Sequence, residues 1–229
     1  MPDAAAAPKR DPIALLLTLL FVVTGLVDAT SVLGLGKVFT ANMTGNVVFL
    51  GFALAGAPGF HWLHFVVALL AFGAGAVVSA RLFRARAAHG RRRWLVTAAW
   101  IEAGLLWVAA ACALPVVDAS TASVTYLLIV LTAAAMGSRN ATVQHLKVPD
   151  LTTTVLTRTI TALAVDSRLA GGAGTNFGRR WHAIVAMFVG AVIGGLLVLR
   201  IGVALPLALA GLGTLVATLI LAVDEEGAA

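Results

Sequence analysis

The chain has 229 residues, of which 60% are hydrophobic and only 11% are charged, and its formal net charge is +6. Soluble domains carry about 25% charged residues, so this composition, with a mean hydropathy of +0.99, excludes an ordinary soluble domain. The basic residues stand in short blocks between apolar segments, so we expect no nucleic-acid partner. The single cysteine, Cys112, rules out a disulfide framework and a cysteine-based metal site, and we expect no cofactor.

Apolar segments separated by polar or basic stretches define the predicted elements. A spanning helix needs about 20 largely apolar residues, and six segments have that character: 12–35, 62–80, 94–117, 123–144, 181–199 and 203–223. Two further segments, 37–57 and 151–165, are interrupted by runs of polar side chains. The predicted fold is all-α and membrane-embedded, with six transmembrane helices and two short segments that are either re-entrant or broken full spans.

The positions of the basic residues favour re-entrant segments, because loops rich in Lys and Arg stay in the cytoplasm. Two basic residues precede the first span, and a block of arginines from Arg81 to Arg93 follows the second. If segment 37–57 crossed the membrane fully, these two groups would lie on opposite sides. If it enters and returns, both are cytoplasmic, and the same reasoning makes segment 151–165 re-entrant from the cytoplasmic side. Arg200, in a predicted external turn, is a mild signal against this topology.

The chain also resembles itself at a separation that grows slowly along the sequence. Residues 25–30 resemble residues 137–142, which follow them by 112 positions. Residues 75–78 resemble residues 190–193, at a separation of 115 positions. Each match is weak alone, but their collinear order along the chain indicates an internal duplication.

This duplication divides the chain into two membrane repeats with a short tail at either end. The four parts are a cytoplasmic tail 1–11, a first repeat 12–117, a second repeat 118–223 and an acidic cytoplasmic tail 224–229. Each repeat would hold three crossings, so the two would insert with opposite orientations. Inverted repeats with interrupted segments in corresponding positions are typical of transporters that bind solute near the bilayer midplane.

The two polar runs are the main candidates for a substrate site. Lipid offers polar groups no replacement for water, so the runs should face protein, solute or a water-filled cavity, and we expect them to face one another. A lone threonine often hydrogen-bonds only its own helix backbone, but clustered polar side chains are poorly explained in that way. The candidate residues of the first half are Asp28, Thr40, Asn42, Thr44, Gly45 and Asn46. Those of the second half are Asn140, Thr152, Thr153, Thr154, Thr157 and Arg158.

Two acidic residues lie inside predicted spans. Asp28 and Glu102 are candidates for proton coupling, because ionisable residues within a membrane are costly and tend to be functional. The structural alternative is an ion pair with Arg139, and for Glu102 we favour it. Arg158 could bind an anion or extend to the lipid headgroups, and the sequence leaves both readings open.

Several motifs give the chain a family resemblance. They are Gly25-x-x-Asp28-Ala29, residues 39–46, Gly137-x-Arg139-Asn140-Ala141 and residues 151–157. Together they resemble the bacterial YoaK family. The resemblance implies a multi-pass protein of the bacterial inner (cytoplasmic) membrane and implies no substrate. With the charge distribution, it leads us to expect both termini in the cytoplasm.

The expected function is that of a small secondary transporter for a small polar or anionic solute, in which one half rocks against the other. A channel, a non-transporting sensor or assembly factor, and an intramembrane enzyme are the alternatives. No Ser-His-Asp set, metal signature or phosphate-binding loop stands out in the sequence, so we do not expect an enzyme. The expected partners are the lipid bilayer, the solute and a second copy of the chain in a homodimer, since six crossings leave little scaffold around a moving part.

Overall fold

The computed structural model describes residues 12–86, 91–114, 122–146, 156–172, 174 and 177–227. Over these ranges the chain is all-helical, as predicted, and contains no strand. The helices are α1 (Pro12–Gly34), α2 (Met43–Leu54), α3 (Trp62–Ala85), α4 (Arg91–Ala113), α5 (Ala122–Leu146), α6 (Leu156–Val165), α7 (Phe177–Arg200) and α8 (Ala204–Gly227), with a 3₁₀ turn at Arg168–Ala170.

Helix length and composition fit a membrane protein. Among the described residues, four helices are long and apolar enough to cross a bilayer, and they are α3, α4, α5 and α7. Helices α1 and α8 are 23 and 24 residues long, and the continuous part of each whose side chains are described, Thr18–Gly34 and Ala204–Ile220, is apolar. With 12 and 10 residues, α2 and α6 would span only about 15–18 Å, at 1.5 Å per residue, of a hydrocarbon layer about 30 Å thick.

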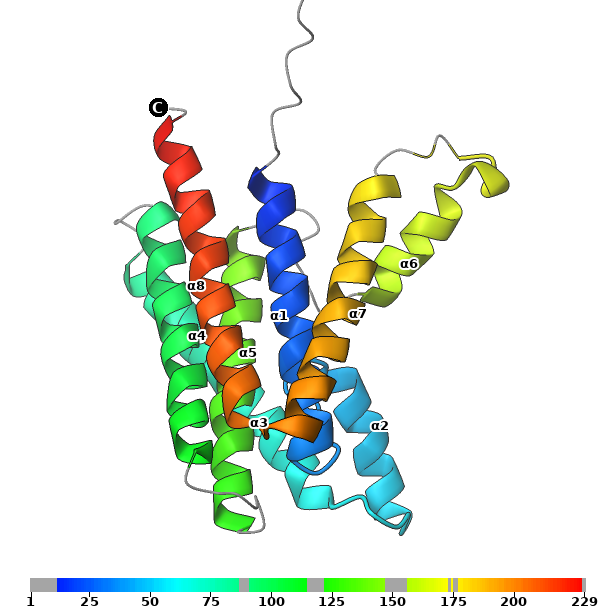
Figure 1. Ribbon diagram of the computed structural model, residues 1–229, viewed down its shortest axis with the longest axis vertical. Coiled ribbons are helices and arrows are strands. Elements are labelled where there is room, and N and C mark those ends of the chain that lie inside the picture. Colours follow the sequence, from blue (N-terminus) through cyan, green and yellow to red (C-terminus); the bar gives the residue numbers. More distant parts are fainter. Residues whose placement is uncertain are drawn as a thin grey trace, which may run out of the picture.

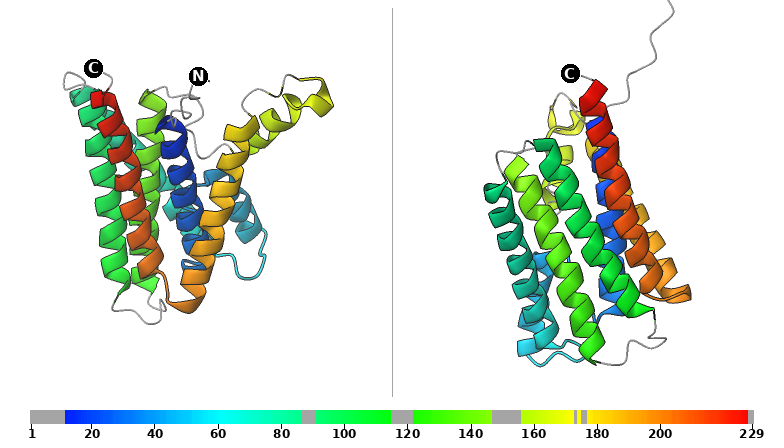
Figure 2. Two further views of the ribbon diagram at one scale, coloured as in Figure 1. Left: turned by 45° about the horizontal axis from the view of Figure 1, so that its top comes forward. Right: turned by 90° about the vertical axis from the view of Figure 1, so that its left-hand side faces the viewer.

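The long helices stand side by side in one bundle (Figure 1). In that view α1 and α7 run downward and pack against each other, whereas α3 and α5 run upward and form a second packed pair. Helix α4 contacts α5 and α8, and α8 also contacts α1. The short helices lie at opposite ends of the bundle, α2 against α3 at the lower end and α6 against α7 at the upper end (Figures 1 and 2).

Glycines allow the backbones of α3 and α5 to meet. A Cβ atom on Gly75 would overlap the carbonyl oxygen of Ala134, and a Cβ atom on Gly137 would overlap the carbonyl oxygen of Phe72. Small residues permit such close approach between membrane helices, where dispersion contacts between backbones replace the missing hydrophobic driving force. Any larger residue at these two positions would therefore force the helices apart.

The crossing of α1 and α7 is built in the same way. Gly25 lies against the carbonyl oxygen of Met187, and Gly190 lies against that of Val22. Neither glycine leaves room for a side chain, so this pair is also held backbone to backbone.

Apolar side chains occur both inside the bundle and on its outer surface. The largest buried cluster includes Val27, Leu35, Phe65, Leu106 and Leu128, all at most 4% exposed. Large apolar side chains on the outer face of α7 include Phe188, Val189, Val192, Ile193 and Leu196, at 40% exposure or more. A helix that is apolar on all sides has lipid as its surrounding medium, so the bundle contacts the bilayer.

Candidate functional site

A carboxylate of α1 holds the first polar run in place. The Oδ1 atom of Asp28 accepts hydrogen bonds from the backbone N–H groups of Ala41 (2.9 Å) and Thr40 (3.3 Å). These N–H groups belong to the non-helical segment between α1 and α2, so no helix offers them a backbone partner. An ionised acceptor satisfies such groups strongly. The sequence therefore folds the chain back beside α1 after that helix has ended.

Asn46, on α2, clamps the same segment from the other side. Its Oδ1 atom accepts a hydrogen bond from the backbone N–H of Phe39 (2.9 Å), and its Nδ2 atom donates one to the Phe39 carbonyl oxygen (2.6 Å). The Nδ2 atom also lies 3.5 Å from the sulfur of Met43. Asn46 is fully buried. Its amide imitates a backbone peptide group, so its hydrogen-bonding capacity is used by the fold.

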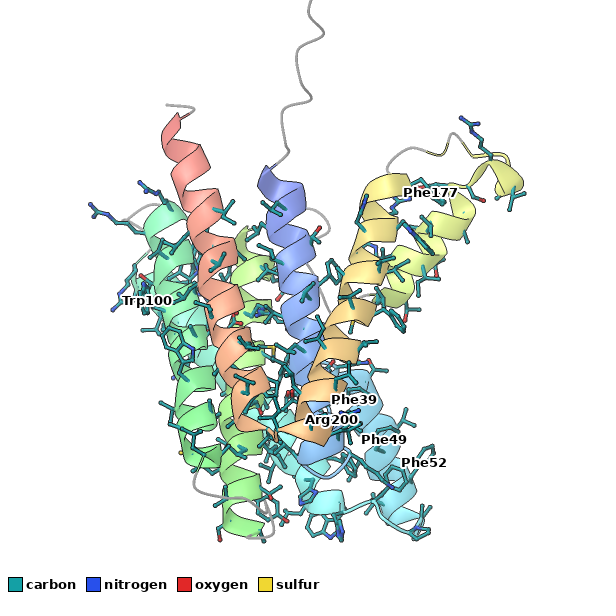
Figure 3. The ribbon with its side chains drawn as sticks, viewed as in Figure 1. Phe39, Phe49, Phe52, Trp100, Phe177 and Arg200 are labelled. Atoms are coloured by element: carbon teal, nitrogen blue, oxygen red, sulfur yellow. The ribbon has the colours of Figure 1, made fainter. Side chains whose placement is uncertain are left out.

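Gly45 makes room for an aromatic ring. A Cβ atom at Gly45 would lie 2.6 Å from Cδ2 of Phe39. The Phe39 ring stacks on Phe49, with centroids 5.7 Å apart, and Phe49 contacts Phe52 at 6.0 Å. These three rings gather along α2 (Figure 3). Gly45 thus allows the segment that contains Phe39 to pack on α2.

Two buried oxygen atoms at this place have no hydrogen-bond partner among the described residues. They are Oδ2 of Asp28 and Oγ1 of Thr40, and the two residues are only 5% and 0% exposed. Asn42 stands immediately before α2 and makes no side-chain capping bond, while Thr44 is exposed on α2. Among the first-half candidates, Asp28 and Thr40 therefore combine burial with unused hydrogen-bonding capacity.

A second polar cluster joins four helices near the centre of the bundle. Arg139 of α5 donates through Nη2 to Oε1 of Glu102 on α4, with which it forms an ion pair. The same Nη2 atom donates to Oγ1 of Thr214 on α8 (2.9 Å), and Thr214 donates to Glu102 (2.8 Å). The Nη1 atom donates to Oγ1 of Thr24 on α1 (3.1 Å). All four residues are at most 5% exposed.

This cluster contains the structural pairing that the sequence offered for Glu102. It also contains Thr24 and Thr214, which sequence reasoning missed. Spacing does not single out Thr214, because the offset of 115 positions that relates residues 75–78 to residues 190–193 would pair Glu102 with Ala217. No signal singles out Thr24 among the threonines of the spans either.

The second-half candidates are less fully described. Thr152, Thr153 and Thr154 lie outside the described residues. Thr157 and Arg158 are exposed on α6. Asn140 is half-buried on α5 and donates from Nδ2 to the carbonyl oxygen of Met136 (2.9 Å). The prediction that the two polar runs face one cavity is untested.

An ion pair fixes the hairpin of α6 and α7. Arg180 pairs with Asp166 and also donates to the carbonyl oxygen of Ala162 (3.0 Å). Asp166 lies in the turn after α6, and its side chain is 41% exposed. Its carboxylate therefore has a structural role in this hairpin. Within the described ranges, no group of three or more His, Cys, Asp or Glu side chains could hold a metal ion.

Apolar helices around buried, hydrogen-bonded charges define a multi-pass helical membrane protein. The family comparison agrees: residues 16–220 match the family described as "Protein of unknown function (DUF1275)". The chain belongs to this family. It is 34% identical over 157 residues to the UPF0700 transmembrane protein YoaK of Bacillus subtilis (strain 168), a match that covers 66% of this chain and 65% of that protein. The chain thus matches just under two thirds of its relative's length, and no solved structure matches it.

Proposed function

We propose that this protein is a small secondary carrier built from two inverted halves, with its solute site beside the anchored segment between α1 and α2. The observation that carries the proposal is the pair of buried, unpartnered oxygens on Asp28 and Thr40. Buried polar groups without partners are costly. A site that binds and releases a polar solute explains why such groups persist inside the bundle.

The helix packing supports the inverted halves. If α1 corresponds to α5 and α3 to α7, then the α1–α7 pair should resemble the α5–α3 pair. The glycine contacts agree: Gly25 on Met187 corresponds to Gly137 on Phe72, and Gly190 on Val22 corresponds to Gly75 on Ala134. The corresponding helices α1 and α5 also run in opposite directions (Figure 1). Two-fold symmetry with its axis in the membrane plane relates halves in this way.

The short helices support the same arrangement. Helix α2 follows α1 and α6 follows α5, so the two occupy corresponding positions in the two halves. They lie at opposite ends of the bundle (Figure 1), which is what re-entry from opposite faces of the membrane requires. In this proposal their starting ends bring unwound backbone toward the midplane, where a solute can bind it.

The described charges favour a neutral or cationic solute over an anionic one. The buried arginine, Arg139, is already paired with Glu102, so it offers little attraction to an anion. Arg158 is exposed on α6. The two unpartnered oxygens, on Asp28 and Thr40, are hydrogen-bond acceptors, and only the Thr40 hydroxyl can also donate while the carboxylate is ionised.

Ligand-dependent stabilisation followed by flux measurement tests the proposal. The purified protein would be heated in detergent with a panel of amines, amino acids, polyols and organic acids, since a bound ligand raises the unfolding midpoint. A stabilising solute should then enter proteoliposomes at a saturable rate, whereas a non-saturating rate would indicate a channel.

The matched variants for this test are Thr40→Val and Thr97→Val. The Thr40 hydroxyl is unpartnered and buried, whereas the Thr97 hydroxyl donates to the carbonyl oxygen of Arg93 (2.8 Å). Thr40→Val should remove stabilisation and uptake together, and Thr97→Val should keep both. A panel in which no solute stabilises the protein or enters the vesicles would contradict the carrier.

A further inference from the structure

We propose that Asp28 and Thr40 form a binding point for one small monovalent cation, which accompanies the solute in the carrier proposed above. Asp28 lies on α1, and Thr40 lies in the non-helical segment that returns beside α1. Their Oδ2 and Oγ1 atoms are both buried and unpartnered. The backbone N–H of Thr40 donates to Oδ1 of Asp28, so the two residues lie side by side.

The charge of Asp28 points to a cation rather than to a neutral ligand. Asp28 accepts two backbone hydrogen bonds but makes no ion pair within the described part of the chain. The nearby Arg139 has its Nη2 atom on Glu102 and Thr214 and its Nη1 atom on Thr24. A buried carboxylate without a counter-ion is costly, and a bound cation would remove that cost.

The available ligand atoms suit a small, hard cation. Carboxylate and hydroxyl oxygens are the donors that such ions prefer. Unwound backbone beside a membrane helix is also a known setting for monovalent cations in carriers, because its carbonyl groups are free of helical hydrogen bonds. The segment between α1 and α2 is unwound at Thr40 and Ala41. The rings of Phe39 and Phe49 stack on each other beside this segment.

The corresponding position in the second half indicates that folding does not require the negative charge. Asn140 stands where the repeat would place Asp28. An amide oxygen can accept backbone N–H groups as a carboxylate oxygen does, so an anchoring role alone would not select aspartate. The asymmetry therefore predicts one cation per chain, at the first half.

Thermal unfolding of the full-length protein in detergent tests this inference without any need for transport. The unfolding midpoint would be measured in lithium, sodium, potassium, ammonium and methylammonium chloride, against N-methyl-D-glucamine chloride at equal ionic strength. We expect at least one small cation to raise the midpoint by a few degrees in a saturable manner. Saturation by an alkali ion would identify a metal-ion site, and saturation by ammonium alone would identify an organic or ammonium ligand.

Three variants locate the effect. Asp28→Asn should abolish the cation-dependent shift while Oδ1 still accepts the two N–H groups, and Thr40→Val should weaken the apparent affinity at least tenfold. Asp166→Asn removes a carboxylate elsewhere and should leave the shift unchanged. If Asp28→Asn does not fold, the cation-dependent shift in Thr40→Val, compared with that in Asp166→Asn, still tests the site.

Two results would overturn the inference: no small cation exceeds N-methyl-D-glucamine, or Asp28→Asn and Thr40→Val keep the full shift. Failure of the carrier gives a different pattern, because cation binding would persist in a protein that moves no solute into vesicles. Conversely, solute uptake that is the same in every chloride salt would keep the carrier and show that no cation accompanies the solute.

Discussion

Glu102 of α4 and Thr214 of α8 hydrogen-bond to each other at 2.8 Å, although they stand 112 residues apart in the chain. The contact joins α4, which belongs to the first predicted repeat, to α8, which belongs to the second. Arg139 of α5 donates to both residues, so one buried guanidinium ties three helices together at this place.

Removing Glu102 should destabilise the bundle strongly. Glu102→Ala leaves the buried guanidinium of Arg139 without its counter-ion, which costs about 3–5 kcal/mol in buried pairs. The free energy of unfolding in mixed micelles measures the loss. The double variant Glu102→Leu with Arg139→Leu should regain much of it, because no buried charge is then left. A double variant less stable than Glu102→Ala would contradict this account.

Asn46 and Asn42 should differ sharply when each is replaced by alanine. Asn46→Ala removes both hydrogen bonds to the Phe39 backbone and leaves those groups unsatisfied, so we expect a loss of about 1–3 kcal/mol. Asn42 makes no capping bond, so Asn42→Ala should change stability by less than about 0.5 kcal/mol. Asn42→Ala should nevertheless abolish ligand-induced stabilisation. Equal losses of unfolding free energy in the two variants would contradict the role of Asn46 in holding the Phe39 backbone.

Gly75 and Gly73 offer a matched pair on α3. Gly75→Ala would drive a methyl group into the backbone of Ala134, whereas a Cβ atom at Gly73 meets nothing within 4 Å. Gly75→Ala should therefore cost at least about 1–3 kcal/mol through overpacking, and Gly73→Ala should be neutral or stabilising by up to about 1 kcal/mol. Unfolding midpoints in one detergent give both values. A neutral Gly75→Ala would contradict the close approach of α3 and α5.

Cysteine labelling tests the orientation in the membrane. Pro58 precedes α3 and Arg86 follows it, and both are exposed. In a Cys112→Ala background, Pro58→Cys should react with a membrane-impermeant maleimide added outside intact cells. Arg86→Cys, beside the arginine block, should react only after the membrane is opened. The opposite pattern would invert the topology, and labelling of both from outside would mean that α3 does not cross.

The sequence predicted the helical class and the two short segments for a sound physical reason. Polar runs inside apolar sequence are tolerated only where lipid is excluded, and α2 and α6 do lie beside those runs. Boundaries were less accurate. Helix α3 was expected over 62–80 but continues to Ala85, because arginines are good helix formers and extend a helix beyond its apolar core.

The site was predictable as residue types but not as partners. Asn46 was expected to bind substrate, yet its amide pairs with the backbone of Phe39. The pattern Asn-Met-Thr-Gly-Asn does not show which of its side chains hydrogen-bonds to the protein's own backbone. Thr24 joins Arg139 only because α1 and α5 lie close enough in space, and such proximity is a property of packing rather than of spacing along the sequence.

The glycine crossings also change which parts of the molecule can move as units. Where backbones touch, no side chain lies between the helices to repack. Each crossed pair should therefore move as one rigid unit. The fixed pairs are α1 with α7 and α3 with α5, and each pair takes one helix from either half of the sequence. In the proposed carrier, alternating access would then move these two pairs relative to each other, with α4 and α8, which pack on each other, between them. Arg139 spans that boundary, so its bonds to Thr24 and Thr214 would serve as the latch that one conformation closes and the other opens.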